Sequence, residues 1–230
     1  MQDRIISIGS LARHPLWPMD AMRDPRPPHA TTTLILDGDA AILVDPGLPG
    51  QIIASRLLER SGLSPADITH VFLTSFKADT CRGLPTFEEA TWLVSESERE
   101  AVGTPLAMTL KKALDEEGQG SDVVSELELQ VAMLARCEAA PDKLTNMVSL
   151  FPLPGVTPGP CGLLLAYPTR TTLITGDAVA TTEHLDQGTV LDDAHDLDKA
   201  RESFAEAIEV ADVIIPGRDN LLINPTRRPF

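Results

Sequence analysis

Four polar side chains follow a short apolar run in the stretch LTSFKADTCRGLP, residues 73–85. They come directly after the apolar residues 71–73 and are Ser75, Lys77, Asp79 and Thr80. Polar clusters at the end of a buried strand are where α/β proteins often place their chemistry. This cluster offers a carboxylate that could bind a cation, and a serine near a lysine that could act as nucleophile and base.

Two later apolar runs also end in charged residues. Asp177 follows TTLITG, residues 171–176, and Arg218 follows DVIIPG, residues 212–217. Each charged residue has a simpler explanation, because Asp177 could serve a turn and Arg218 could pair with its neighbour Asp219. Within the first cluster, Asp79 could likewise cap a short helix and Lys77 could be solvated.

The elements that must position these residues follow from the periodicity of the sequence. Residues 31–47 contain two β-rich runs around Asp37-Gly38, which predicts a hairpin. The spacing of Ile53 and Leu57 predicts a helix that ends near Gly62. Further strands are predicted at 68–74, 90–95, 147–153, 161–167, 171–176 and 212–217.

Helical patterns occupy the remaining long segments. Residues 96–136 are predicted as helical with a break at 116–122, and a final helix carries Phe204 and Ile208 on one face. This order favours sheet layers covered by helices over one doubly wound parallel sheet. We interpret the chain as a single domain, 1–230, with a helical insertion at about 96–140. The Pro-rich stretch 24–29 is interpreted as an ordered loop.

The composition limits the partners. The formal net charge of −15 argues against nucleic acid and against an anionic membrane surface. The three cysteines have no framework spacing, which fits a reducing compartment. The first residues lack a signal-peptide apolar run, and no stretch approaches the roughly 18 uncharged apolar residues of a membrane span. We therefore expect a cytoplasmic protein with no nucleic-acid or membrane partner.

Five segments carry a resemblance to a known family, and they are residues 43–47, 73–84, 154–160, 174–178 and 214–219. In order and spacing they resemble the metallo-β-lactamase-fold hydrolases, the superfamily of glyoxalase II and the lactonases, over roughly residues 30–220. The resemblance implies an αββα sandwich in which two mixed sheets pack face to face with helices outside. It also implies a dinuclear centre of zinc, iron or manganese that lowers the pKa of a bound water.

The resemblance assigns the metal ligands of the family to seven positions of this chain. The family's histidines correspond to Ser75, Lys77, Thr80, Val156 and Arg218, and its aspartates to Asp79 and Asp177. No imidazole remains in this set, so we expect a vestigial site and no metal cofactor. If a metal is held, Asp79 and Asp177 would be its ligands.

The charges of the replacements suggest what the site has become. Lys77 and Arg218 bring about two positive charges to the place where the resemblance puts about four units of metal charge. Burying Asp79 and Asp177 without a counter-charge would be costly. Our interpretation is that side-chain cations replace the metals. The favoured function is a pseudoenzyme with a binding, regulatory or scaffold role toward an unidentified small molecule or protein, and the family allows a homodimer.

Two enzymatic alternatives remain. The first is a metallo-hydrolase for a thioester, lactone or other ester, with an altered or weak metal site helped by the acidic stretch 181–198. A relocated site there would use His184, His195, Asp192 or Asp193, although the stretch is better interpreted as a charged, solvated loop. The second is a metal-free Ser75–Lys77 pair, which is disfavoured because the neighbouring carboxylates would keep the lysine charged.

Overall fold

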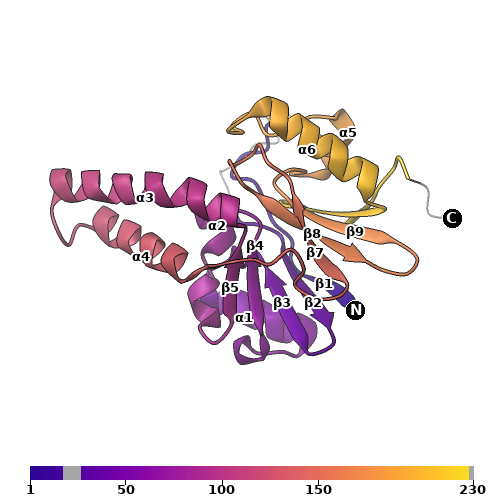
Figure 1. Ribbon diagram of the computed structural model, residues 1–230, viewed down its shortest axis with the longest axis horizontal. Helices are drawn as coiled ribbons and strands as arrows, with labels where there is room; N and C mark the ends of the chain where they lie inside the picture. Colours follow the sequence, from indigo (N-terminus) through magenta and orange to yellow (C-terminus); the bar gives the residue numbers. More distant parts are fainter. Residues whose placement is uncertain (18–26, 228–230) are drawn as a thin grey trace.

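Two stacked sheets form the centre of the molecule, with helices on their outer faces (Figure 1). The computed structural model describes residues 1–17 and 27–227, so residues 24–26 of the expected Pro-rich loop lie outside the described residues. Each sheet contains both parallel and antiparallel neighbours. The prediction of an αββα arrangement with two mixed sheets is therefore confirmed.

The first sheet has the strand order β1-β2-β3-β4-β5-β6 within the described residues. These strands are β1 (Gln2–Ser7), β2 (Thr32–Asp37), β3 (Ala40–Val44), β4 (His70–Leu73), β5 (Thr91–Val94) and β6 (Glu138–Ala139). β1, β2 and β3 pair antiparallel, whereas β3, β4, β5 and β6 pair parallel. The predicted hairpin joins β2 to β3, and its turn residue Gly38 has a φ of 59° that glycine adopts without steric cost.

The second sheet has the strand order β11-β10-β9-β8-β7 within the described residues. These strands are β7 (Val148–Pro152), β8 (Cys161–Ala166), β9 (Thr171–Gly176), β10 (Val213–Pro216) and β11 (Leu222–Ile223). β9 and β10 are parallel, and the other neighbours are antiparallel. The parallel pair matters for the site because its two carboxyl ends share one edge of the sheet.

Alternation along the strands divides the core into layers. Successive side chains of a strand point to opposite faces, so each inner strand contributes to two cores. Ile42 and Phe72 of the first sheet meet Ile174 and Ile215 of the second in the layer between the sheets, and all four are at most 2% exposed. The two sheets are therefore held together by aliphatic and aromatic packing.

Helices cover both outer faces. α1 (Gly50–Ser61) buries Ile53 and Leu57 against the first sheet and ends, as predicted, at Gly62. α6 (Leu197–Val210) buries Phe204 and Ala207 against the second sheet. Short helices at the strand ends are α2 (Ala78–Cys81), α5 (Thr182–Gln187), and the 3-10 turns Pro65–Asp67 and Leu84–Phe87. None of the described helices is long and apolar enough to cross a membrane.

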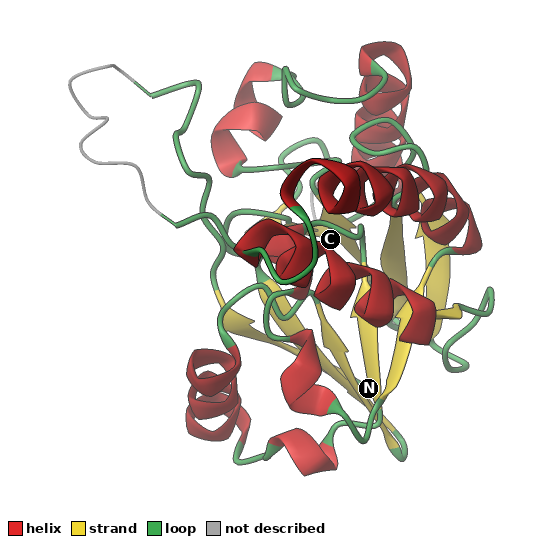
Figure 2. Cartoon of the chain, turned by 90° about the vertical axis from the view of Figure 1, so that its left-hand side faces the viewer, coloured by secondary structure: helices red, strands yellow, loops and turns green. Residues whose placement is uncertain are grey.

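A pair of helices extends away from the sheets. α3 (Glu96–Glu117) and α4 (Asp122–Arg136) form an arm at the left of Figure 1, which points toward the viewer in Figure 2. The predicted helical segment with its break is confirmed, because residues 118–121 separate the two helices. Along the arm, the buried residues are Glu98, Ala113, Val124, Met133 and Leu134. Most of its surface is consequently exposed.

Candidate functional site at the strand ends

The carboxyl ends of neighbouring strands bring distant residues to one edge of the sandwich. Pro216 of β10 is in register with Gly176 of β9, so Asp177 and Arg218 follow side by side. Gly217 permits this approach, since a Cβ atom there would lie only 2.6 Å from Asp177 Oδ1. Glycine at this position therefore lets the Asp177 carboxylate sit against the backbone that leads to Arg218.

Arg218 binds two carboxylates at once. Its Nε donates to Asp177 Oδ1 at 2.7 Å and its Nη2 donates to Asp177 Oδ2 at 2.8 Å. Its Nη1 donates to Asp79 Oδ2 at 2.5 Å. The planar guanidinium group thus holds Asp177 bidentately. It also links Asp177 to Asp79 in α2, the helix that follows β4 of the first sheet.

Lys77 adds a second cation to the cluster. Its Nζ lies 3.3 Å from Asp177 Oδ2, so both oxygens of Asp177 have cationic partners. The Arg218 and Asp177 side chains are 2% and 6% exposed, whereas those of Asp79 and Lys77 are 21% and 30% exposed. The cluster therefore has a dry core, formed by Arg218 and Asp177, and a partly hydrated rim.

The pKa shifts follow from this arrangement. Burial alone would raise the pKa of Asp177, but the charges and hydrogen bonds of Arg218 and Lys77 lower it well below its ordinary value. Burial alone would likewise lower the pKa of Arg218, and the two carboxylates instead raise it. Both groups are consequently charged at neutral pH, and each ion offsets the desolvation cost of the other.

The other candidate positions serve the local structure. Thr80 Oγ1 donates to Ser75 O at 2.7 Å and accepts from Lys77 N at 3.1 Å, which closes the loop before α2. Asp79 does not cap α2, because the N-cap of that helix is Lys77. The loop is therefore held by backbone and hydroxyl contacts, which leaves the Asp79 carboxylate free to bind Arg218.

Val156 is not part of the charged cluster. It is 6% exposed and packs in a small apolar core with Ala180, Leu191 and Ala200. Within the described residues, no hydrogen bond joins Lys77 Nζ to Ser75, and the lysine contacts Asp177 instead. The structure thus brings together Lys77, Asp79, Asp177 and Arg218, and it does not form the Ser75–Lys77 pair.

Asp45 is a buried acid that the sequence analysis did not single out. It follows β3 with a φ of 49°, and its two carboxyl oxygens accept from Thr74 N at 2.8 Å and Thr74 Oγ1 at 2.7 Å. Burial raises the pKa of Asp45 to about 7, and the two hydrogen bonds from Thr74 lower it only in part. The Asp-Pro-Gly sequence after a buried strand was the available signal, but it also describes an ordinary turn.

Glu98 is a second buried acid that the sequence analysis missed. This α3 residue is fully buried and accepts from Phe76 N at 2.9 Å, Thr157 Oγ1 at 2.7 Å and Gly159 N at 3.1 Å. It therefore ties the loop after β4 to the loop between β7 and β8. The sequence Ser95-Glu96-Ser97-Glu98 has the form of a capping box, which explains why Glu98 resembled an ordinary helix-start residue.

The acidic stretch 181–198 is only in part the solvated loop that was expected, because Asp192, Asp193 and His195 are exposed outside any helix whereas the residues before them pack into the protein. Its first part forms α5, and His184 is 1% exposed. Thr181 Oγ1 lies 2.9 Å from His184 Nδ1 and 3.0 Å from His14 Nε2, so this segment packs against the N-terminal chain. Among the described residues, no group of three or more His, Cys, Asp or Glu side chains is arranged to hold a metal ion.

A strand-end site between two stacked mixed sheets defines a class of αββα proteins, and the sequence comparison identifies the family. The profile of the Metallo-beta-lactamase superfamily matches residues 25–218, so the chain belongs to this superfamily. No curated protein matches the chain significantly.

Solved structures of this class share the fold. A Thermotoga maritima protein assigned to the metallo-beta-lactamases is 19% identical, with a TM-score of 0.66 over 96% of this chain and 98% of its own. AidC, a dizinc quorum-quenching lactonase, is 17% identical, with a TM-score of 0.61 over 78% of this chain and 67% of its own. A mutant of AiiA from B. thuringiensis, with N-decanoyl-L-homoserine at its active site, is 17% identical, with a TM-score of 0.62 over 94% and 92%.

The superfamily implies a metal centre, and the donor set described above does not fit one as it stands. The cluster offers two carboxylates, and the three carboxylate oxygens that face Arg218 already accept its hydrogen bonds. Two like unit charges 4 Å apart repel by about 4 kcal/mol at an effective dielectric constant of about 20. The repulsion between a divalent metal ion and a guanidinium at the same distance is about twice as large. A metal ion on Asp177 would therefore require Arg218 to move away.

Replacing Arg218 should lower the stability of the protein, because its charge compensates the buried carboxylate of Asp177. We expect Arg218→Ala to lower the free energy of unfolding by about 3–5 kcal/mol, because it leaves the buried Asp177 with only the partly exposed Lys77 as a counter-charge. The double variant Asp177→Asn/Arg218→Ala should cost less than the sum of the single variants Asp177→Asn and Arg218→Ala, which with the natural chain complete the cycle. Urea denaturation measures all four proteins, and Arg201→Ala, from an exposed pair on α6, is the control with little effect. Additive single effects would contradict the coupling.

Glu98 should be needed to hold the two loops. We expect Glu98→Ala to lower the free energy of unfolding by about 2–5 kcal/mol, because two backbone N–H groups and one hydroxyl lose their acceptor. Glu100→Ala, two residues further along α3 and exposed, should change stability by less than about 0.5 kcal/mol. Thermal and urea unfolding measure both variants, and equal effects would refute this role of Glu98.

Asp45 should make stability depend on pH. Its folded pKa lies above the ordinary value of 3.8, so the folded state keeps a proton that the unfolded chain releases, and stability falls as pH rises from about 4 to about 7. The slope from one group is at most about 1.4 kcal/mol per pH unit. Asp45→Asn should remove this slope, since its amide can donate to Thr74 Oγ1 and its carbonyl can accept from Thr74 N.

Urea denaturation at several pH values between 4 and 8 measures this effect. The exposed Asp115→Asn variant on α3 is the control, and it should keep the pH dependence of the natural chain. A pH profile of Asp45→Asn that is parallel to that of the natural chain would contradict the assignment.

Proposed function

We propose that this chain is a member of the metallo-β-lactamase superfamily in which an ion-pair cluster replaces the dinuclear metal centre. The observation that carries the proposal is the Arg218 guanidinium, which binds Asp177 bidentately and Asp79 through its third nitrogen. In this account the chain is a pseudoenzyme with a binding, regulatory or scaffold role. The positions that the family resemblance assigns to histidines, Ser75, Lys77, Thr80, Val156 and Arg218, then form a vestigial site.

The contacts that join the two sheets at this edge support the proposal. A metal centre links loops of the two sheets through its ligands, and in this chain other contacts make these links. Arg218 joins the end of β10 to Asp79 in α2, and Glu98 joins the loop after β4 to Gly159. In this account these contacts hold the loops of the site in place of a metal.

A second candidate is a metallo-hydrolase for a thioester, lactone or other ester, with an altered or weak metal site. The structural likeness to AidC, a dizinc lactonase, favours it, as does the presence of two carboxylates at one sheet edge. Asp79 and Asp177 would then be the ligands, and Arg218 would have to release both. This requirement counts against the candidate on the geometry, whereas the likeness to lactonases favours it over the first candidate.

The partners and the location remain part of the proposal. We infer a small molecule or a protein as the partner, with no nucleic acid and no membrane, and we leave a homodimer open. The net charge of −15 supports the exclusion of polyanions. A cytoplasmic location is supported by the cysteines Cys81, Cys137 and Cys161, which are all free thiols.

Metal binding separates the two candidates. We expect the purified chain to contain far less than one equivalent of zinc, iron or manganese, and its melting temperature to stay constant when EDTA or zinc is added, because nothing metal-bound stabilises the folded state. Elemental analysis and thermal melts measure this. Stoichiometric metal that is lost in Asp177→Ala, together with hydrolysis of a thioester, lactone or ester, would establish the hydrolase instead.

A paired variant provides the positive control. Lys77→His/Arg218→His removes both cations and adds two imidazoles beside two carboxylates, so it should gain zinc-dependent stabilisation. Lys77→Gln/Arg218→Gln removes the cations without adding ligands, and it should gain much less. If zinc raised the melting temperature of the natural chain and of both variants by the same amount, the side-chain cations would not exclude metal.

A further inference from the structure

Poor helix formers are concentrated near the base of the arm formed by α3 and α4, although α3 itself is continuous. Gly103, Thr104 and Pro105 lie in succession inside α3, where glycine and proline are the poorest helix formers. Pro105 has no N–H to donate to the carbonyl of Ala101, and its ring crowds that carbonyl, which bends or loosens a helix. The helix therefore contains, in this one segment, three residues that do not favour it.

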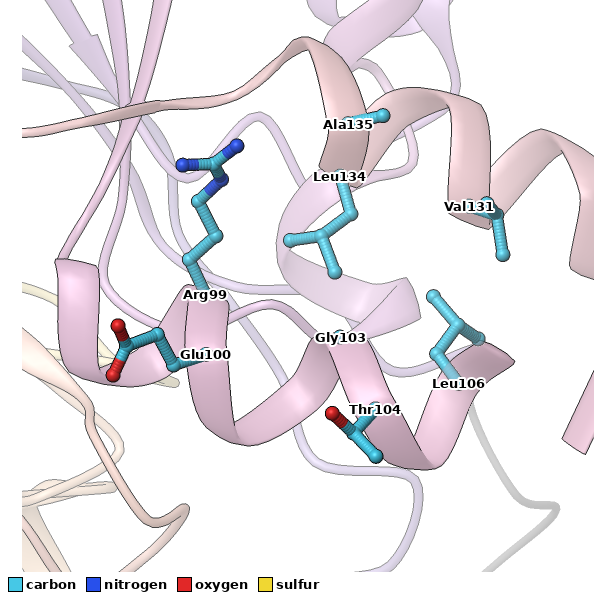
Figure 3. Close-up of a pocket in the computed structure, with 8 residues that line it drawn as sticks. All are labelled: Arg99, Glu100, Gly103, Thr104, Leu106, Val131, Leu134 and Ala135. Atoms are coloured by element: carbon cyan, nitrogen blue, oxygen red, sulfur yellow. The ribbon is translucent and has the colours of Figure 1, made fainter. Parts of the chain in front are cut away.

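A shallow cavity of about 370 Å³, open to solvent and with Arg99 among its exposed lining residues, lies at this segment between the two helices (Figure 3). This volume lies at the lower end of the range of about 300–1,000 Å³ found for small-molecule sites. The residues that line it come from both helices and are Arg99, Glu100, Gly103, Thr104, Leu106, Val131, Leu134 and Ala135. Leu106 and Val131 point toward each other across the space and Leu134 points toward α3 near Gly103, so the middle of the cavity is apolar.

Gly103 keeps the cavity open. A Cβ atom at this position would have Leu134 Cδ2 as its nearest neighbour, at 3.9 Å, which is ordinary contact. Its φ is not positive, so neither backbone conformation nor close helix packing requires glycine here. Alanine would favour the helix by about 1 kcal/mol, yet the side chain that would begin to fill the cavity is absent.

Arg99 provides a cation at one end of the cavity. Its guanidinium reaches from α3 into the space between the helices, whereas the Glu100 carboxylate points away from it (Figure 3). Within the described residues, the Arg99 side chain has no hydrogen bond or ion pair. Arg136, which stacks 3.8 Å from the ring centre of Trp92, is a second cation at the base of the arm. An apolar space beside an unpaired guanidinium suits a ligand with an apolar chain and an anionic group.

We propose that the cavity between α3 and α4 binds an amphipathic carboxylate, with its chain among Leu106, Val131 and Leu134 and its carboxylate on Arg99. This site is separate from the strand-end cluster, so it goes beyond the proposed function and does not depend on it. A second copy of the chain suits the cavity less well. Two molecules of net charge −15 repel each other, and a stable interface needs about 800 Å² from each partner.

Calorimetric titration with octanoate tests the proposal. The natural chain should bind one equivalent, Arg99→Gln should raise the dissociation constant at least tenfold, and 1-octanol should bind at least tenfold more weakly than octanoate. Gly103→Leu should abolish binding because its side chain fills the cavity. Arg201→Gln, on the exposed face of α6, is the matched control and should bind like the natural chain.

The stability of Gly103→Leu shows whether lost binding could be due to unfolding. Gly103→Leu should melt at or above the temperature of the natural chain, since it removes a glycine from a helix interior, so lost binding would not reflect unfolding. Octanoate binding that persists in Gly103→Leu, or that is unchanged in Arg99→Gln, would overturn the proposal. Size-exclusion chromatography that shows a dimer, converted to a monomer by Gly103→Leu, would identify a second copy as the occupant and would also overturn it.

Discussion

The strand-end site depends on one buried ion pair, between the guanidinium of Arg218 and the carboxylate of Asp177. Neither ion could be buried alone, because removing an unpaired charge from water costs several kcal/mol. Together they satisfy each other through two hydrogen bonds, of 2.7 and 2.8 Å. Asp79 and Lys77 then complete the charge balance at the rim, with two carboxylates facing two cations.

The backbone around the pair is arranged to permit this contact. β9 and β10 run parallel and in register, so the residues that follow them emerge next to each other. Gly217 leaves room for the Asp177 carboxylate, and Gly176, with a φ of 51°, turns the chain beside Thr74. Thr74 in turn holds Asp45, so the ion pair, the turn at Gly176 and the buried acid Asp45 form one connected network.

Much of the fold could be predicted from the sequence, because its strands and helices carry strong periodic signals. The hairpin at Asp37-Gly38, α1 with its terminal Gly62, and the break between α3 and α4 are examples. β1 was missed since, at the edge of its sheet, only Ile6 is buried and the alternation is weak. α5 was missed because its acidic surface hides the burial of His184, which depends on packing against His14.

The candidate site could be predicted only in part. The charges of Lys77, Asp79, Asp177 and Arg218 suggested an ion-pair cluster, and the structure brings these four side chains together. Sequence position could not reveal Asp45 or Glu98, since their roles arise from partners 29 and 61 residues away. The burial of a single acid leaves no pattern in the local sequence. The residues around Asp45 also fit an ordinary turn, and those around Glu98 also fit an ordinary helix start.

The central claim is that side-chain cations occupy the place of the metal centre, and a crystal structure of the chain grown with excess zinc tests it most directly. Anomalous scattering at the zinc absorption edge locates any bound ion without assumptions about its ligands. The account predicts no anomalous peak between Asp79 and Asp177, with Arg218 bound bidentately to Asp177. A strong peak bridging the two carboxylates, with Arg218 displaced toward solvent, would contradict it.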